Sequence, residues 1–111
     1  MEYHPHKWLL VQIQDGNEML YKVFGSFYGG FTDGDSWKMN SGITSIEDCG
    51  DYFRVYGYSG SVYLCAKENY GASFYGSSVL ADFEKRSEGK LCVIPTLEAA
   101  MALTRHLIKA Q

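Results

Sequence analysis

Residues 7–27 read KWLLVQIQDGNEMLYKVFGSF, and this stretch decides the fold class. Two runs rich in Val, Ile, Leu and aromatic residues flank the pair Asp15-Gly16. An Asp-Gly pair between such runs is a strong hairpin signal, because a type I′ turn needs positive φ at both central residues. The stretch therefore predicts two antiparallel strands, over residues 7–14 and 17–27.

The same pattern continues through the next forty or so residues. A second Asp-Gly pair, Asp33-Gly34, follows the first hairpin, and glycine-containing turns recur twice more. These turns separate further strands over residues 36–46, 51–56 and 61–67. Five strands joined by short turns predict an antiparallel meander.

The periodicity changes after Gly71. Apolar residues recur at helical spacing and predict a helix of about ten residues that closes near Gly89. The apolar run from Leu91 to Ile94 predicts a short strand buried on both faces, and Thr96 can cap a last helix that runs to Lys109. We therefore expect one α+β domain over residues 1–111, with both helices on one face of the sheet.

Composition excludes several classes of protein. The chain has 111 residues, of which 46% are hydrophobic and 21% charged, so it is not disordered, and its 15% aromatic content favours β-sheet. A net charge of -3 argues against a nucleic-acid binder. We find no apolar stretch of membrane-spanning length, no secretory signal and no CxxC among the three cysteines. These features predict a cytoplasmic protein with reduced thiols, and we expect a bacterial one that does not bind membranes.

The hairpin around residues 57–60 predicts a candidate binding surface. A two-residue and a four-residue loop both give the same register, in which Phe53 lies opposite Leu64 and Val55 opposite Val62 on the core face. On the other face Arg54 then lies opposite Tyr63, and Tyr52 lies opposite Cys65. The predicted patch combines tyrosines with one arginine, as the centres of protein interfaces do. Its members are Tyr52, Arg54, Tyr56 and Tyr63, with Tyr58 in the adjoining turn.

Three interpretations of this patch remain open. It is a solvated sheet face, an interface with a second copy or another protein, or a cleft for a small molecule or peptide bounded by residues 67–75. Self-association is favoured because the first hairpin carries large apolar side chains on both faces, such as Leu9 and Val11 on one and Trp8 and Leu10 on the other. Helices on one side of a sheet cannot bury both faces.

No catalytic, metal or cofactor site is predicted. Cys49 lies in an acidic turn, which opposes thiolate formation, and Cys92 is expected in the core. Cys65 is expected beside Arg54, so a small enzyme using Arg54 with this thiol or a nearby acid is a third hypothesis, after the two binding functions. His4 and His6 lack a third ligand nearby, and no GxGxxG pattern opens a helix. The sequence therefore predicts a small non-enzymatic binding or self-associating protein.

Overall fold

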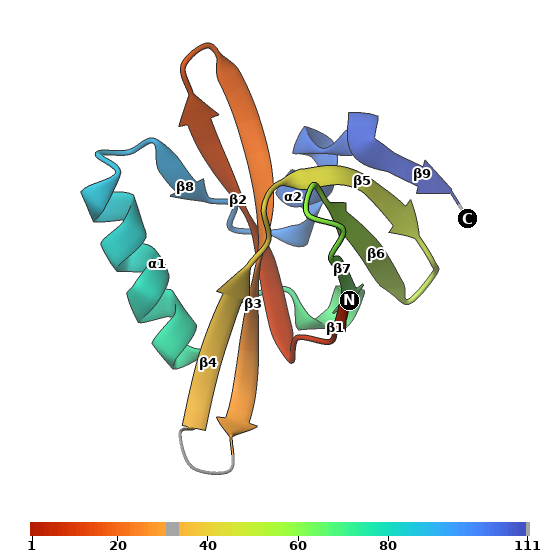
Figure 1. The fold of residues 1–111 in the computed structure, drawn as a ribbon, viewed down its shortest axis with the longest axis horizontal. Helices are drawn as coiled ribbons and strands as arrows, with labels where there is room; N and C mark the ends of the chain where they lie inside the picture. The colour runs from red at the N-terminus through yellow and green to blue at the C-terminus, as the bar shows by residue number, and fades with distance from the viewer. Residues whose placement is uncertain (31–33, 111) are drawn as a thin grey trace.

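The computed structural model describes residues 1–30 and 34–110 and confirms the α+β class (Figure 1). The predicted turn at Asp33-Gly34 lies partly outside these residues. The helices are α1 (Phe74–Arg86) and α2 (Leu97–Leu103), with 3-10 turns η1 (Lys67–Asn69) and η2 (Arg105–Leu107). The strands are β1 (Glu2–Tyr3), β2 (Lys7–Asp15), β3 (Glu18–Gly30), β4 (Gly34–Met39), β5 (Ile43–Asp48), β6 (Tyr52–Gly57), β7 (Val62–Ala66), β8 (Leu91–Val93) and β9 (Ile108–Ala110).

The strands form two sheets rather than the single meander that the sequence predicts. The four-stranded sheet has the order β4-β3-β2-β8, and its pairs are antiparallel. The five-stranded sheet has the order β1-β7-β6-β5-β9. Its consecutive strands pair antiparallel, whereas β1 and β9 add to its two edges in parallel. The predicted hairpins are therefore present, although Asp15 pairs with Glu18 and the first turn is centred on Gly16-Asn17 rather than on Asp15-Gly16. The chain changes sheet between β4 and β5.

That change divides the strand predicted over residues 36–46. Asn40 still occupies the ladder position opposite Val23, since its N–H donates to the Val23 carbonyl over 3.1 Å. Its side-chain Oδ1 accepts the Val23 N–H at 2.9 Å, in place of a backbone carbonyl. Two residues later Gly42 has φ of 131°, which an L side chain rarely adopts. The backbone therefore turns out of one sheet and enters the other.

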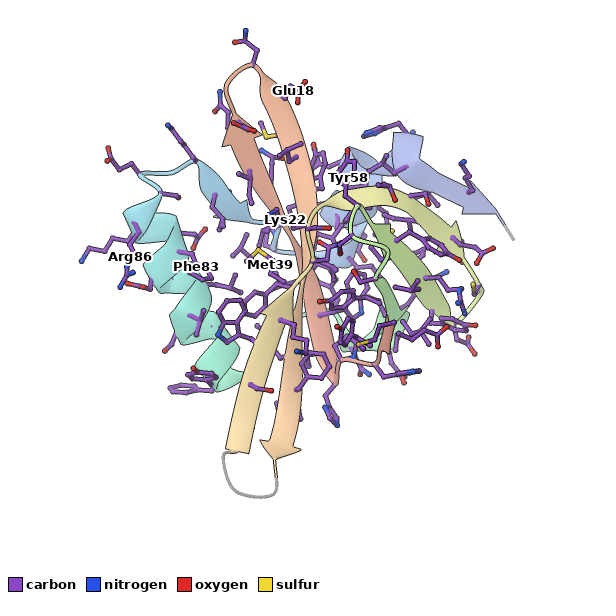
Figure 2. The ribbon with its side chains drawn as sticks, viewed as in Figure 1. Glu18, Lys22, Met39, Tyr58, Phe83 and Arg86 are labelled. Atoms are coloured by element: carbon purple, nitrogen blue, oxygen red, sulfur yellow. The ribbon has the colours of Figure 1, made fainter. Side chains whose placement is uncertain are left out.

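The four-stranded sheet is buried on both faces. Leu9 and Phe24 pack on one face with Leu80 of α1, and Figure 2 shows Phe83 of the same helix near this sheet. On the other face, Trp8 and Leu10 pack against the five-stranded sheet, together with residues of α2. The helices thus belong to opposite sides of this sheet, which corrects the expectation that both cover one face. The chain covers its two-sided apolar hairpin itself, without a second copy.

Trp8 joins the two sheets. Its side chain is fully buried, and its indole N–H donates to the Ala66 carbonyl at the end of β7 over 2.6 Å. The ring meets Tyr70 edge-on at 4.9 Å and Phe53 at 6.2 Å between centroids. A buried indole needs such an acceptor, because an unpaired buried N–H costs about 1–3 kcal/mol. Trp8 therefore fixes the position of β2 against the end of β7.

The β6–β7 hairpin has a register one residue away from the predicted one. Its loop has three residues, since the Gly57 N–H donates to the Ser61 carbonyl at 3.0 Å and Gly60 has φ of 90°. A three-residue loop of this kind combines a type I turn with a left-handed bulge residue, usually glycine. Val55 consequently pairs with Tyr63, and Arg54 pairs with Leu64.

This register changes which residues lie on each face of the β6–β7 hairpin. Tyr63 is 3% exposed and faces the core with Cys65, contrary to its expected place beside Arg54. Val62 and Leu64 take their places on the outside, because a shift of one residue turns every side chain to the opposite face.

The predicted last helix also ends early, at Leu103, and the chain continues as η2 and β9.

We predict that Tyr63→Ala destabilises the fold by about 3–5 kcal/mol, as truncation of a fully buried aromatic side chain does. Tyr56→Ala, on the outer side of the neighbouring strand, should cost less than about 1.5 kcal/mol. Urea unfolding followed through Trp fluorescence gives both values. Equal losses for the two variants would contradict the observed register.

Candidate functional site

The side of the five-stranded sheet that points away from the core carries the candidate site. Register places alternate residues of all five strands on this side, which we call the outer face. Among the described residues neither helix covers it, because α1 packs on the other sheet and α2 adds its apolar side to the core between the sheets. The larger side chains of the outer face are those of Glu2, Glu47, Tyr52, Arg54, Tyr56, Val62, Leu64 and Lys109.

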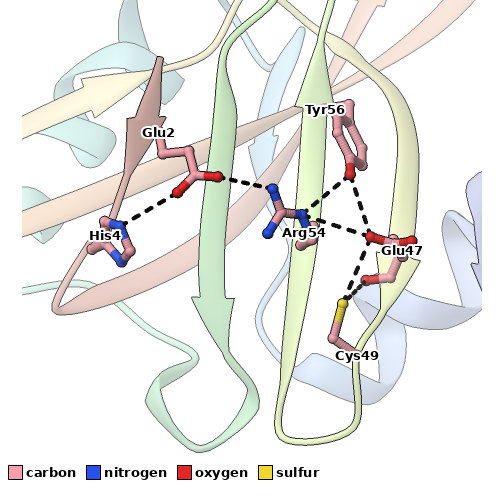
Figure 3. A network of polar contacts seen from close by, with 6 residues as sticks. All are labelled: Glu2, His4, Glu47, Cys49, Arg54 and Tyr56. Carbon is pink, nitrogen blue, oxygen red and sulfur yellow. Dashed lines mark hydrogen bonds and ion pairs between the residues drawn. The ribbon is translucent and has the colours of Figure 1, made fainter. Parts of the chain in front are cut away.

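Arg54 lies on the central strand β6 and connects three strands (Figure 3). Its Nη2 lies 2.9 Å from Glu2 Oε2 on β1, and its Nε lies 3.6 Å from Glu47 Oε1 on β5. The Nε also donates to the Tyr56 hydroxyl at 3.2 Å, and that hydroxyl donates to Glu47 at 3.3 Å. One guanidinium thus holds two carboxylates and a phenol in a single network.

This network fixes the charge state and orientation of Arg54. The hydrogen bond with Tyr56 and then that with Glu2 raise the pKa of the Arg54 guanidinium further above its ordinary value, so the group stays charged at any physiological pH. A guanidinium shared between two carboxylates has few N–H groups left for an anionic substrate. The arrangement therefore organises a surface and does not resemble an anion site or an acid-base pair.

The structure brings together some of the residues predicted for the site and separates others. Tyr52, Arg54 and Tyr56 share the outer face, each half-buried. Tyr63 is in the core. Tyr58 is 70% exposed in the β6–β7 loop, where its ring lies beside Gly42, away from the Arg54 network. Three of the five predicted residues therefore remain candidates for one surface.

Sequence reasoning missed five members of the outer face. Val62 and Leu64 were assigned to the core by the register error, and Glu47 lies opposite Arg54 across the short turn between β5 and β6. The short turn could have revealed Glu47, because residues opposite each other in an antiparallel pair lie on the same face of the sheet. Glu2 and Lys109 reach the sheet through parallel pairings with distant segments. No local pattern in the sequence predicts pairings between segments so far apart in the chain.

The cysteines are not a catalytic set. Cys65 is fully buried, and this burial raises the pKa of its thiol well above the ordinary value, which opposes the reactive thiolate. Cys49 is half-buried near Glu47, with its Sγ 3.8 Å from Glu47 Oε1. Cys92 is exposed on the edge strand β8, which corrects its expected place in the core. The register also separates Cys65 from Arg54, so the hypothesis of an enzyme pairing the two loses its geometric basis.

We predict that alkylation of the native protein with iodoacetamide modifies Cys92 first. Cys65 should react at least roughly a hundredfold more slowly, because its thiol becomes accessible only when the domain opens. Peptide mapping by mass spectrometry over time measures each rate. A Cys65 rate comparable with that of Cys92 would contradict the buried position.

A second charged pair ties the end of β5 to the end of β7. Lys67 Nζ donates to Asp48 Oδ1 at 2.7 Å and lies 4.5 Å from the centroid of the Phe53 ring. The Gly50 N–H donates to the same carboxylate oxygen at 3.0 Å. The Lys67 hydrogen bond, and then that of Gly50, hold the pKa of Asp48 below its ordinary value. The pair is partly exposed, so it contributes modestly to stability.

The lowered pKa of Asp48 predicts a pH dependence of stability. A carboxyl whose pKa is lower in the folded state stabilises the fold above its unfolded pKa, near 4, and loses this contribution as the pH falls through the folded pKa. Asp48→Asn should therefore lose less stability than the wild type between pH 5 and pH 2.5. Urea midpoints at the two pH values measure the difference, with Asp35→Asn in exposed β4 as the charge-matched control. An unchanged pH dependence in Asp48→Asn would contradict this role.

The histidines near the N-terminus have protein partners. His6 Nδ1 accepts the Tyr28 N–H at 3.1 Å, and its ring stacks on Tyr28. His4 Nε2 lies 3.9 Å from Glu2 Oε1. In the part of the chain that the structure describes, no group of three His, Cys, Asp or Glu side chains could hold a metal ion. Neither α1 nor α2, the helices of that part, has the length and apolar composition that crossing a membrane requires.

Two hollows open beside the five-stranded sheet. One, of about 480 Å³, lies at the β5–β6 turn and is lined by Tyr52, Lys67 and their neighbours, near the cleft expected beside residues 67–75. Arg54 does not line it. The other, of about 380 Å³, lies where the chain passes between the sheets and is lined by residues of β1, β4, β7 and the adjoining loops, Asn40 among them.

Comparisons of this chain with models of protein families, with curated proteins and with solved structures give no match. Candidate functions therefore rest on the geometry of the chain alone.

Proposed function

We propose that this chain is a non-enzymatic binding protein that pairs with a second copy of itself through the outer face. One observation carries the proposal. The middle of the face holds tyrosine and aliphatic side chains around the Arg54–Glu47 pair. One edge strand bears an acid, Glu2, and the opposite edge strand bears a base, Lys109. The two carboxylates and two cations of the face leave it formally neutral.

This charge arrangement is complementary to itself. A two-fold axis parallel to the central strand β6 places the β1 edge of one copy over the β9 edge of the other. Glu2 then faces Lys109 of the second copy twice, once at each edge, as an isologous interface requires. Arg54 lies close to the axis, where Glu2 and Glu47 of its own copy already neutralise it. Two sheets commonly pack face to face with their strands nearly aligned.

The size of the face predicts a weak dimer. Five strands spaced about 4.8 Å apart span roughly 19 Å, and strands of five or six residues run for roughly 18 Å. This footprint is smaller than the roughly 800 Å² per partner of a standard stable interface. We therefore expect a dissociation constant on the order of 100 µM, which increases with salt because the edge charges are exposed.

A cytoplasmic location is part of this proposal. All three cysteines are free, although Cys92 is exposed on the surface. Free surface thiols persist in reducing compartments. The free thiol of Cys92 therefore supports this location.

Sedimentation velocity from about 10 µM to about 1 mM tests the dimer, because this range brackets the expected constant. Glu2→Lys and Lys109→Glu should each weaken association about tenfold, since each places like charges at both edges. An equimolar mixture of the two variants should associate again, because every edge contact then pairs opposite charges. Lys90→Glu, at an exposed position in the loop just before β8, makes the same charge change as Lys109→Glu and should leave association unaltered.

Two results would overturn the proposal. One is a wild-type chain that stays strictly monomeric to about 1 mM, the upper end of that range. The other is a mixture of the two edge variants that associates no better than either alone. Far-UV circular dichroism and urea midpoints show that each variant is folded.

A further inference from the structure

The strand β4 forms an edge of the four-stranded sheet, and we call its side that faces away from β3 the open edge. The strand is last in the order β4-β3-β2-β8, and its strand partner is β3 (Figure 1). At the end of this pair Asn40 and Val23 exchange two hydrogen bonds, one of them through Asn40 Oδ1. Because such bonds alternate along an antiparallel strand, the N–H groups and carbonyls of Trp37 and Met39 point away from β3. None of these four groups has a hydrogen-bond partner among the described residues.

The opposite edge of the same sheet is capped by the chain itself. In β8 the N–H groups of Leu91 and Val93 point away from β2, since those of the alternate residues face it. The Leu91 N–H donates to Ser87 Oγ at 2.9 Å, and the Val93 N–H donates to Glu84 Oε2 at 3.1 Å. Both acceptors lie at the C-terminal end of α1. The chain therefore caps one edge of this sheet and leaves the other, six residues long, as a template for a further strand.

Side chains on the two sides of β4 differ in character. Trp37 and Met39 lie on the α1 side, where the Trp37 ring meets Phe83 edge-on at 5.4 Å between centroids (Figure 2). Both are half-buried and keep part of their apolar surface accessible. The exposed Asp35 shares this side, because alternate residues of a strand face the same way. Lys38 is exposed and points to the other side.

An extended peptide that pairs antiparallel with β4 meets these side chains in a fixed order. Residues that lie opposite each other in such a pair share a face of the sheet. Read from its N-terminus, a complementary peptide has an apolar residue opposite Met39, an acid opposite Lys38 and a second apolar residue opposite Trp37. Two residues further on it has a base opposite Asp35. Backbone hydrogen bonds then supply affinity, and the alternating side chains supply specificity.

We propose that the open edge binds an extended segment of another protein, added antiparallel to β4, in which one acid lies between two apolar residues. A second copy of this chain fits less well. Pairing β4 with its own counterpart around Trp37 brings Asp35 opposite Met39 and Lys38 opposite Ser36, so neither charge meets an opposite one. The open edge belongs to the four-stranded sheet, so this proposal is independent of the dimer through the outer face.

The test titrates ¹⁵N-labelled protein with the peptide acetyl-Val-Glu-Val-Thr-Lys-amide and follows the backbone amides by NMR. Saturable shifts are expected at residues 35–39, with a dissociation constant on the order of 1 mM, as suits a short flexible peptide. Hydrogen exchange of the Trp37 and Met39 N–H groups should slow at least about fivefold at saturation, because each gains a carbonyl acceptor. The amides of β8 should not shift.

Two N-methylated peptides separate backbone pairing from side-chain contact. The N–H of the peptide valine opposite Trp37 donates to the Trp37 carbonyl, whereas the N–H of the glutamate points away from β4. N-methylation of that valine should weaken binding at least about tenfold, because it removes a backbone hydrogen bond and crowds the edge. N-methylation of the glutamate makes the same chemical change and should alter affinity less than about threefold.

A charge exchange tests the contact with Lys38. Lys38→Glu places two acids opposite each other and should weaken binding of the glutamate peptide about fivefold. A peptide with lysine in place of glutamate should bind this variant more tightly than it binds the wild type. Lys90→Glu, in the loop just before β8, is the matched control and should leave both affinities unchanged. Far-UV circular dichroism shows that each variant is folded.

Several results would overturn the proposal. These are the absence of saturable shifts up to about 10 mM peptide, well above the expected constant, shifts centred on β8 or the outer face, and equal affinities of the two N-methylated peptides. Slow exchange of the Trp37 and Met39 N–H groups without peptide, increasing with protein concentration, would instead assign the open edge to a second copy.

Discussion

The hydrogen bond from the Trp8 indole to the Ala66 carbonyl is the contact on which the arrangement of the two sheets depends. Apolar packing between two sheets is not directional, whereas a buried indole N–H needs one acceptor in one place. Tyr70 adds a second constraint, because its hydroxyl donates to the Ile94 carbonyl at 2.7 Å and its ring packs on Trp8. Together these polar contacts select one alignment among the many that hydrophobic burial alone would allow.

This alignment also explains why the outer face and the crossing between the two sheets differ in character. The outer face is carried by paired strands, and its only arginine is held by Glu2 and Glu47, so the surface is organised without a ligand. The hollow beside Asn40 lies where the chain leaves one ladder for the other. There the side-chain amide completes the ladder with its oxygen and leaves its nitrogen unpaired. A flat organised surface of this kind suits a protein partner.

Local chemistry determined which parts of the fold could be predicted. Glycine turns and alternating apolar residues identified the hairpins, helical spacing identified α1, and the Thr96 cap identified the start of α2. Each of these signals depends on residues close in sequence. The division into two sheets depends on a single left-handed residue, Gly42, inside an otherwise continuous strand pattern. The parallel additions of β1 and β9 depend on contacts across most of the chain. The acid and base at the edges of the outer face were therefore beyond sequence reasoning.

The three-residue β6–β7 loop has a consequence for how this sequence can vary. Most surface turns tolerate insertions and deletions, because the strands that they connect keep their register through their own apolar pattern. Here loss or gain of one loop residue, with the strands re-paired around the new turn, would bring Val62 and Leu64 inside and turn Tyr63 and Cys65 outward. Both faces of the hairpin would still carry apolar side chains after this exchange, so hydrophobic burial would favour the original register only weakly. Descendants of this sequence should therefore vary the identity of residues 58 and 59 more freely than the length of the loop.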